Sequence, residues 1–510
     1  MPHEHRGVRE RLRYSYASLP LPHREGDWGL RAFSGSGKGD GMEAGGFRAG
    51  VGRVEITPPL SAPHASWGAQ VHVLPDGAEA ALWATVLVVT DSGGETAAFA
   101  DLDLVIVSRE ESDAIRVAVA HAVSIAPTAV RLSVTHNHAG PPPSAWDWAA
   151  EGGDALRGYY AQLSAYVAGA ARLAVRGLRP ARIGVGAGAS RVARNRRETA
   201  PDGRTVTGVD PVGPIEPLVQ VTRIDDRAGE PVAAIVGYTM HPTALGPSNR
   251  LVSPDWPGHM KRAVETLTGA PCLFAQGATG DIGPGEIGYT DDVRAVRRLG
   301  AAVGAEAARV WLETRLPTVT YRHSRIWESG APLGVWEAVP DEGPEPAVRT
   351  LACEVPLPVA ALPPLAEAEA DVRDAVGHLD ALVRRGAPAA EVEAATFVAK
   401  RANMTLFRVR TFGGRETFPV ALHLLRIGPA VFAGAECEPF HEIGTAIRAR
   451  SPFPHTWFGG YTGGWFGYVP TPEEYPRGGY EVYTSPYTPD AAAALVEGTV
   501  AALNELASLP

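Results

Sequence analysis

Two histidines one residue apart, His136 and His138, are the side chains of this chain best suited to chemistry. They lie in the stretch THNHAGPP at residues 135–142, directly after an apolar run at residues 129–134. Side chains alternate between the faces of a strand, so both imidazoles are expected on one face. Imidazole is the commonest metal ligand and titrates near neutral pH. The spacing alone is compatible with a metal site and equally with two histidines that cap a strand.

Two later groups could join these histidines around one divalent cation. His241 follows an apolar run at residues 232–240 and precedes a proline, while Glu438 stands near an expected helix start. An aromatic stretch at residues 457–483 follows, and most of it is interpreted as core and interface packing. Nitrogen and oxygen ligands without a thiolate suit zinc, with one position left open for water. A zinc centre at strand ends is therefore a hypothesis that the spacing permits.

Two further stretches have a functional and a structural interpretation. The turn GATGDIGPG at residues 277–285 lets the backbone approach a ligand, and it lacks the GK[ST] ending of a phosphate loop. Its Asp281 could orient a ligand histidine, or it could simply form the turn. The basic run SRVARNRR at residues 190–197 is either a solvated loop or the source of an arginine that polarises a carbonyl group.

The three cysteines, Cys272, Cys353 and Cys437, do not point to thiol chemistry. None belongs to a CxxC pair, which argues against a disulfide scaffold and against a thiolate zinc site. Cys437 lies between acidic residues that should raise the pKa of its thiol, so it is not expected to be a nucleophile.

The elements that must position these residues alternate between strands and helices, which predicts an α/β fold. Ser108 and Glu111 form a capping box at the start of a helix between two strands, a βαβ order. Asp255 is expected to begin another helix, and a strand is expected to resume at Phe407. Expected strands cover residues 48–56, 84–90, 97–104, 129–134, 181–188, 217–224, 232–240, 272–276, 418–427 and 430–432; expected helices cover 108–123, 154–176, 292–314, 365–385, 389–403, 436–450 and 489–506.

Composition excludes several classes of protein. The chain has 510 residues and a formal net charge of −10, without a Lys/Arg-rich block, so nucleic acid is not an expected partner. No run reaches the ~18 apolar residues of a membrane span. Residues 1–45 are polar and lack an apolar signal region, so we expect a flexible extension and a cytoplasmic location.

Taken together, the motifs resemble the neutral/alkaline ceramidase family. The similar segments follow the family's order across residues 46–485, so the likeness does not rest on one motif. They are residues 50–59, Leu102-Asp103, 135–141, 240–242, 276–284, 438–440, 467–471 and 479–481.

The resemblance implies roles for individual residues. One zinc ion per chain would be bound by His136, His241, Glu438 and Tyr468, and Glu438 is preferred over Glu436 because its Glu-Pro-Phe context fits better. His138 would contact the substrate and pass a proton to the leaving group. The remaining implied site residues are Arg196 and Tyr480 for carbonyl polarisation, with Asn195, Gly277 and Thr279 at the substrate.

The chain departs from the family at two points. Ceramidases carry a serine where this chain has Gly277, and Thr279 lies two residues further on. Gly277 is expected to leave room for a different acyl or amine group. The family's immunoglobulin-like C-terminal domain is not expected. We therefore predict one large α/β domain at residues 46–508, with mixed sheets flanked by helices and a helical excursion at residues 360–403.

The resulting hypothesis is a zinc-dependent hydrolase that cleaves an amide bond of a small acylated substrate through metal-activated water, with ceramide itself not expected. Ester, lactone or sugar-derivative hydrolysis stays open, as does a catalytically silent binding protein of the same fold. A homo-oligomer is compatible with the sequence.

Overall fold

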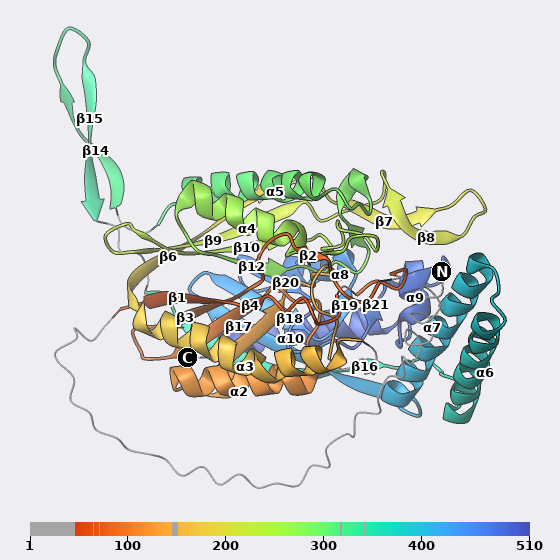
Figure 1. Ribbon diagram of the computed structural model, residues 1–510. Coiled ribbons are helices and arrows are strands. Elements are labelled where there is room, and N and C mark those ends of the chain that lie inside the picture. Colours follow the sequence, from red (N-terminus) through yellow and green to blue (C-terminus); the bar gives the residue numbers. More distant parts are fainter. Residues whose placement is uncertain are drawn as a thin grey trace.

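The computed structural model describes residues 46–64, 66–70, 72–144, 151–316, 319–340, 343 and 345–509. The extension expected at residues 1–45 lies outside these ranges. Within them, strands and helices alternate and build two main sheets with helices on their outer faces, as the α/β expectation requires (Figure 1).

The larger sheet has eight strands in the order β12-β10-β9-β6-β1-β3-β4-β5. Parallel strands β4 and β5 are joined by α2, which confirms the βαβ unit, and the capping box at Ser108 and Glu111 is present. The strands are β1 (Arg48–Glu55), β3 (Trp83–Thr90), β4 (Thr96–Leu102), β5 (Val130–Val134), β6 (Arg179–Ala189), β9 (Leu218–Asp226), β10 (Pro231–Tyr238) and β12 (Cys272–Gln276).

The second sheet has four strands in the order β16-β17-β18-β20, and it packs against the first. Phe99 of the large sheet meets Phe432 of the small one edge to face, with ring centroids 5.4 Å apart. Apolar side chains from both sheets form one buried cluster there. The strands are β16 (Val348–Pro358), β17 (Thr417–Ile427), β18 (Ala430–Ala435) and β20 (His455–Gly459).

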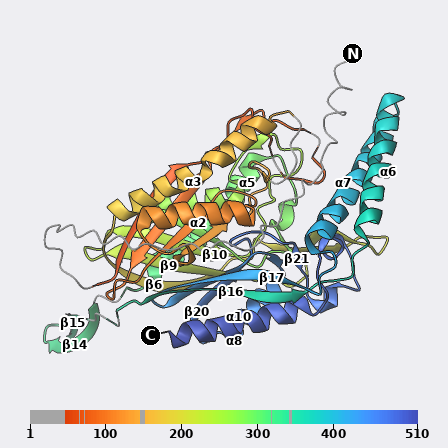
Figure 2. The same ribbon diagram turned by 90° about the horizontal axis from the view of Figure 1, so that it is seen from below.

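Helices cover the outer faces. Helices α2 and α3 lie on one side and α8 and α10 on the opposite side, with the sheets between them (Figure 2). Helices α4 and α5 cover the β9, β10 and β12 part of the large sheet. The helices are α2 (Arg109–Val123), α3 (Gly153–Arg176), α4 (Asp255–Thr268), α5 (Val293–Glu313), α6 (Leu365–Arg384), α7 (Ala389–Phe412), α8 (His441–Arg450), α9 (Tyr480–Thr484) and α10 (Ala491–Ser508).

The large sheet curves until its two edges come close together, and side chains join them. On β12, the backbone N–H of Phe274 donates to the carboxylate of Asp101 on β4 over 2.9 Å. Just beyond, the Gln276 amide donates to the carbonyl of Thr135 over 3.1 Å and to that of Met240 over 3.2 Å. We call this junction of the β5 and β12 ends the seam. It brings together chain segments that follow opposite ends of the strand order.

Asp101 and Asp103 serve this packing rather than catalysis. Both carboxylates bind the ammonium group of buried Lys261 on α4, at 3.0 and 2.6 Å. The two carboxylates lie on one side of the strand end, and they tie α4 to the large sheet.

Two expectations about the elements were wrong or incomplete. Phe407 lies inside α7, so no strand resumes there, because the helical periodicity continues to Phe412. The basic run is not only a loop, since β7 (Arg194–Thr199) forms a small sheet with β8 (Thr205–Asp210) and β13 (Ile282–Gly283). The helical excursion is confirmed as the paired helices α6 and α7 (Figure 2).

Among the residues that the structure covers, no helix combines the length and apolarity that crossing a bilayer requires.

Candidate metal centre

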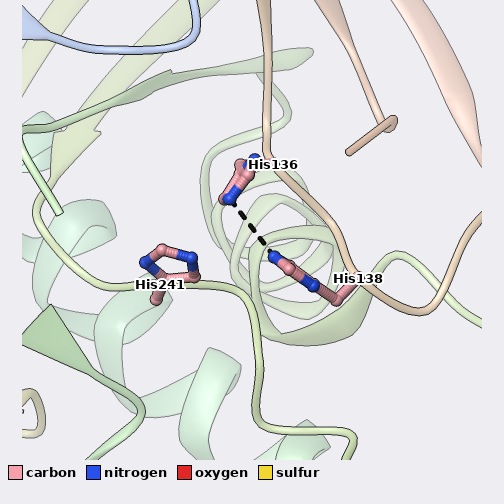
Figure 3. A group of neighbouring side chains, drawn as sticks. All are labelled: His136, His138 and His241. Atoms are coloured by element: carbon pink, nitrogen blue, oxygen red, sulfur yellow. Dashed lines mark hydrogen bonds between the residues drawn. The ribbon is translucent and has the colours of Figure 1, made fainter. Parts of the chain in front are cut away.

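Three histidines converge beside the seam (Figure 3). The Nε2 atoms of His136 and His138 lie 3.2 Å apart, and His241 faces both. One ring nitrogen of each lies within 4.8 Å of the others. Three imidazole nitrogens at these distances are suited to one transition-metal ion.

The alternation of side chains along a strand does not explain why His136 and His138 lie together. Strand β5 ends at Val134, and His136 has a left-handed backbone with φ of 64°. That conformation costs an L-residue ~1–2 kcal/mol, so the surrounding packing must hold it. His138 then returns toward His136. The prediction that both imidazoles project together is confirmed, but a strained turn produces it.

Backbone carbonyls orient all three rings. The Nδ1 atoms of His136, His138 and His241 lie 2.8, 3.0 and 3.0 Å from carbonyl oxygens, those of Val105, Ser66 and Thr279 respectively. A carbonyl can only accept, so each Nδ1 carries the hydrogen and each Nε2 offers a lone pair. This is how proteins commonly position histidine ligands.

Burial keeps these rings neutral. It lowers the pKa of His138 to about 4 and the pKa values of His136 and His241 well below the ordinary 6.5. Neutral imidazole is the form that binds metal, so the site is prepared for an ion at neutral pH.

Glu438 adds a carboxylate to the histidines. Its Oε1 lies 3.5 Å from Nε2 of His136 and its Oε2 lies 3.9 Å from Nε2 of His241. Burial raises its pKa to about 7, despite the opposing charge of Arg196. Glu436 instead accepts from Arg109 and the backbone of Ala421, away from the rings.

Tyr468 and Arg196 lie beside Glu438. Short strands β19 (Glu438–Pro439) and β21 (Tyr468–Val469) pair Glu438 directly with Tyr468. The Tyr468 hydroxyl accepts from Nη2 of Arg196 over 3.1 Å. Nε of Arg196 lies 2.9 Å from the carboxylate of Glu481, a buried ion pair. The arginine is thereby fixed beside Tyr468 and Glu438.

Two aromatic residues that the sequence analysis took for packing residues position this carboxylate. Trp465 donates from Nε1 to Oε1 of Glu438 over 2.6 Å. Tyr461 stacks on His136 with ring centroids 4.0 Å apart, and its hydroxyl lies 3.3 Å from Oε2 of Glu438. Glycines on both sides of Tyr461, at 459, 460, 463 and 464, were the available signal for such close approach.

Of the two roles left open for Asp281, orientation of one of the three clustered histidines is not observed. The Asp281 carboxylate accepts a hydrogen bond from the ring Nδ1 of His441 over 2.5 Å and another from the side-chain amide of Asn195 over 3.3 Å. Neither is one of the three clustered histidines. Asn195 also donates to the carbonyl of Pro214 and accepts from the backbone of Arg197, so it holds the β7 segment that carries Arg196.

The other predicted site residues lie around the metal centre and differ in how far they are exposed to solvent. Thr279 is buried, and its hydroxyl lies 2.8 Å from that of Tyr461. Tyr480, at the start of α9, is 47% exposed, and its ring meets that of Tyr468 edge to face at 5.8 Å. Gly277 does not leave room as expected, because the side chain of Thr239 fills the space beside it.

A second group of aromatic rings lines the centre near His138. Trp67 lies 5.3 Å from His138 and 5.2 Å from Tyr289, measured between ring centroids. The Tyr289 hydroxyl is buried and has no hydrogen-bond partner in the described part of the chain. Neither Trp67 nor Tyr289 belongs to a sequence motif, so the sequence alone did not indicate that they lie near the metal centre.

No protein-family profile and no curated protein matches this sequence. Solved structures do. The crystal structure of neutral ceramidase from Pseudomonas aeruginosa superposes with a TM-score of 0.62 at 20% identity, over 91% of this chain and 75% of that one. The chain has a ceramidase-like fold. A ceramidase complexed with C2 matches with a TM-score of 0.60 at 19% identity, over the same shares of the two chains. The ceramidase-like fold thus confirms the resemblance inferred from the motifs, at the level of architecture.

Proposed function

We propose that this protein is a metal-dependent hydrolase that cleaves the amide bond of a small acylated substrate. The observation that carries the proposal is the set of three Nε2 lone pairs and one carboxylate, each oriented by hydrogen bonds, in a ceramidase-like fold. Such a set of nitrogen and oxygen donors fits zinc.

In this proposal His136, His241 and Glu438 hold the ion. Tyr468 is the fourth ligand and His138 faces the substrate, although His138 lies close enough to compete for that fourth position. The zinc content of two variants tells whether Tyr468 or His138 is the fourth ligand. If Tyr468 is the ligand, Tyr468→Phe should lose much of the zinc and His138→Gln should lose little.

When bound, zinc lowers the pKa of a water molecule toward ~7 and polarises the scissile carbonyl. The protein's own groups do the rest. Arg196, held by Glu481, and Tyr480 would stabilise the negative charge that develops on the carbonyl oxygen, an effect often worth ~3 kcal/mol per donor. Nε2 of His138, since its Nδ1 is engaged by Ser66, would first accept the proton that the attacking water gives up and then pass it to the leaving amine.

A small, mostly apolar cavity that shares Trp465 with the Glu438 contact is the proposed place for an acyl group. It has a volume of ≈ 40 Å³, and Met404, Phe407 and Phe412 of α7 line it together with Trp465. Trp465 therefore contacts both the cavity and the carboxylate.

The test combines metal analysis with a substrate panel. The purified protein should contain about one zinc per chain and hydrolyse N-acyl amides faster than the matching esters. His136→Ala and His241→Ala should lose both metal and activity, whereas His378→Ala, at an exposed position on α6, should keep both. Faster hydrolysis of the esters would instead indicate that the protein is an esterase. Bound metal without turnover would instead indicate a binding protein of this fold.

A further inference from the structure

Strands β14 (Val319–Trp327) and β15 (Leu333–Pro340) form an antiparallel hairpin that extends away from the rest of the molecule (Figure 1). We call it the arm. Within the described residues, β14 and β15 pair only with each other. No sequence motif had suggested it, and it takes no part in the metal centre.

One face of the arm is apolar and open to solvent. Ser324 forms a bulge between two stretches of regular register, in which Tyr321 faces Ala338, His323 faces Trp336 and Ile326 faces Gly334. The alternation of strand side chains places Tyr321, Ile326 and Trp336 on this one face. They are 63%, 57% and 61% exposed.

The opposite face carries balanced charge at its middle and apolar groups at its tip. Arg322 faces Glu337, and Trp327 faces Leu333 next to the turn. Trp327 is 58% exposed and Leu333 is 49% exposed. The arm contains two arginines and two glutamates, so it is formally neutral while the whole chain carries −10.

A free arm of this kind is physically unfavourable. An isolated two-stranded hairpin is marginally stable in water, and both of its outer edges offer unpaired backbone groups. Five large apolar side chains, each about half exposed or more, expose roughly 550 Å² on the two faces together, taking ~150–250 Å² per large side chain, and roughly 350 Å² of this lies on the face of Tyr321, Ile326 and Trp336. Patches of that size on soluble proteins commonly mark interaction sites.

We propose that the arm is a dimerisation element that packs onto a second copy of this chain. Reciprocal exchange favours a second copy over an unlike partner. Counted from these five side chains alone, one arm on an unlike protein would bury about 1,100 Å² over both partners, just under the ~1,200 Å² at the lower end for a stable interface, whereas two exchanged arms would bury about 2,200 Å², well above it. The neutral arm can also approach a second copy that carries −10 without like-charge repulsion.

The mass of the full chain in solution tests the proposal, by light scattering or sedimentation up to about 100 μM, where interfaces of micromolar affinity are filled. Wild type should have twice the chain mass. The triple variant Tyr321→Ser/Ile326→Ser/Trp336→Ser should have the mass of one chain. The control Val117→Ser/Val212→Ser/Leu267→Ser, which removes three exposed apolar groups elsewhere, should stay dimeric.

A variant in which Gly-Ser residues replace residues 319–340 guards against misfolding of the triple variant. It should be monomeric, with the unfolding midpoint of the body unchanged at low protein concentration. A monomeric wild type at every concentration would overturn the proposal, as would a dimer that survives loss of the arm. Arm-dependent binding of a monomer to lipid vesicles or to an unlike protein would overturn it as well. Metal content and hydrolysis do not enter this test, so it stands or falls separately from the proposed function.

Discussion

The side chain of Thr239 lies against the α-carbon face of Gly277, at the ends of neighbouring parallel strands β10 and β12. A β-carbon added at Gly277 would stand 3.1 Å from Cα of Thr239 and would collide with its hydroxyl. Strand register explains the contact, because Tyr238 pairs with Gln276 and the next residues follow side by side. The position where ceramidases carry a serine is therefore occupied here by a hydroxyl from the adjacent strand.

Gly277→Ser should destabilise this protein rather than restore a ceramidase. Overpacking a buried site typically costs ~1–3 kcal/mol, so the free energy of unfolding should fall by about that much. In a Thr239→Ala background the same serine should cost far less, since the colliding hydroxyl is gone. Urea unfolding of the two single variants and the double variant measures the coupling. Strictly additive effects would show that the two sites do not compete for space.

Tyr289→Phe separates a substrate contact from a structural role. If the unpaired hydroxyl of Tyr289 donates to substrate, kcat/KM should fall about 10- to 100-fold, the range of one or two hydrogen bonds. Stability should stay the same or rise, because the variant removes a buried polar group without a partner. Tyr238→Phe is the matched control, since that hydroxyl bonds Ser190 and Ala193 and its loss should lower stability. Unchanged kinetics in Tyr289→Phe would exclude the contact.

Buried histidines outside the metal centre make the metal-free protein sensitive to acid. Burial lowers the pKa of His64 to about 4 and that of His423 to about 3. The unfolded chain takes up protons below pH ~6.5 while the folded chain does not, so stability is complete above that pH and falls as the pH drops toward these values. By pH 5 each group should cost on the order of 1–2 kcal/mol.

Urea unfolding of the chelator-treated protein at pH 7, 6 and 5 checks this dependence. His423→Gln should flatten it, and His378→Gln, at an exposed position, should leave it unchanged. An equal slope in all three proteins would assign the acid sensitivity to other groups.

Trp465→Phe should weaken metal binding without removing any ligand. The indole N–H fixes Oε1 of Glu438 over 2.6 Å, and loss of such a supporting hydrogen bond typically costs 10- to 100-fold in metal affinity. Competition with a chelator of known affinity gives the dissociation constant. Trp327→Phe, on the exposed arm, is the control. Equal affinity in Trp465→Phe and wild type would mean that Glu438 does not bind the ion.

The regular elements were predictable wherever local chemistry decided them. The strand at Cys272–Gln276 and the helix begun by Ser108 appear as expected, because apolar alternation and capping are properties of short segments. The arm was not predictable in this way, since none of the residues that the structure describes covers its apolar face and its pattern predicts no core.

The site was predictable in its residue types and less so in its geometry. His136, His241 and Glu438 come together as the resemblance implied. The orienting groups could not be read from the sequence, because they are backbone carbonyls and two aromatic side chains brought near by long-range folding. The role of Asp281 stayed open for the same reason, since its partner, His441, follows it by 160 residues.

The seam has a consequence for the timing of assembly. Its residues and the carboxylate beside them are separated by roughly 300 residues of chain, from His136 to Glu438, a stretch that a ribosome adds in roughly 15–60 s. Throughout that interval the first two histidines lack the carboxylate, and until the chain has grown by about 105 residues they also lack the third imidazole, that of His241. A nascent chain therefore has no complete site in which to trap the wrong ion. If the protein binds zinc as proposed, metal loading belongs to the finished chain, and the zinc supply after release, rather than during synthesis, should govern how much of the protein becomes active.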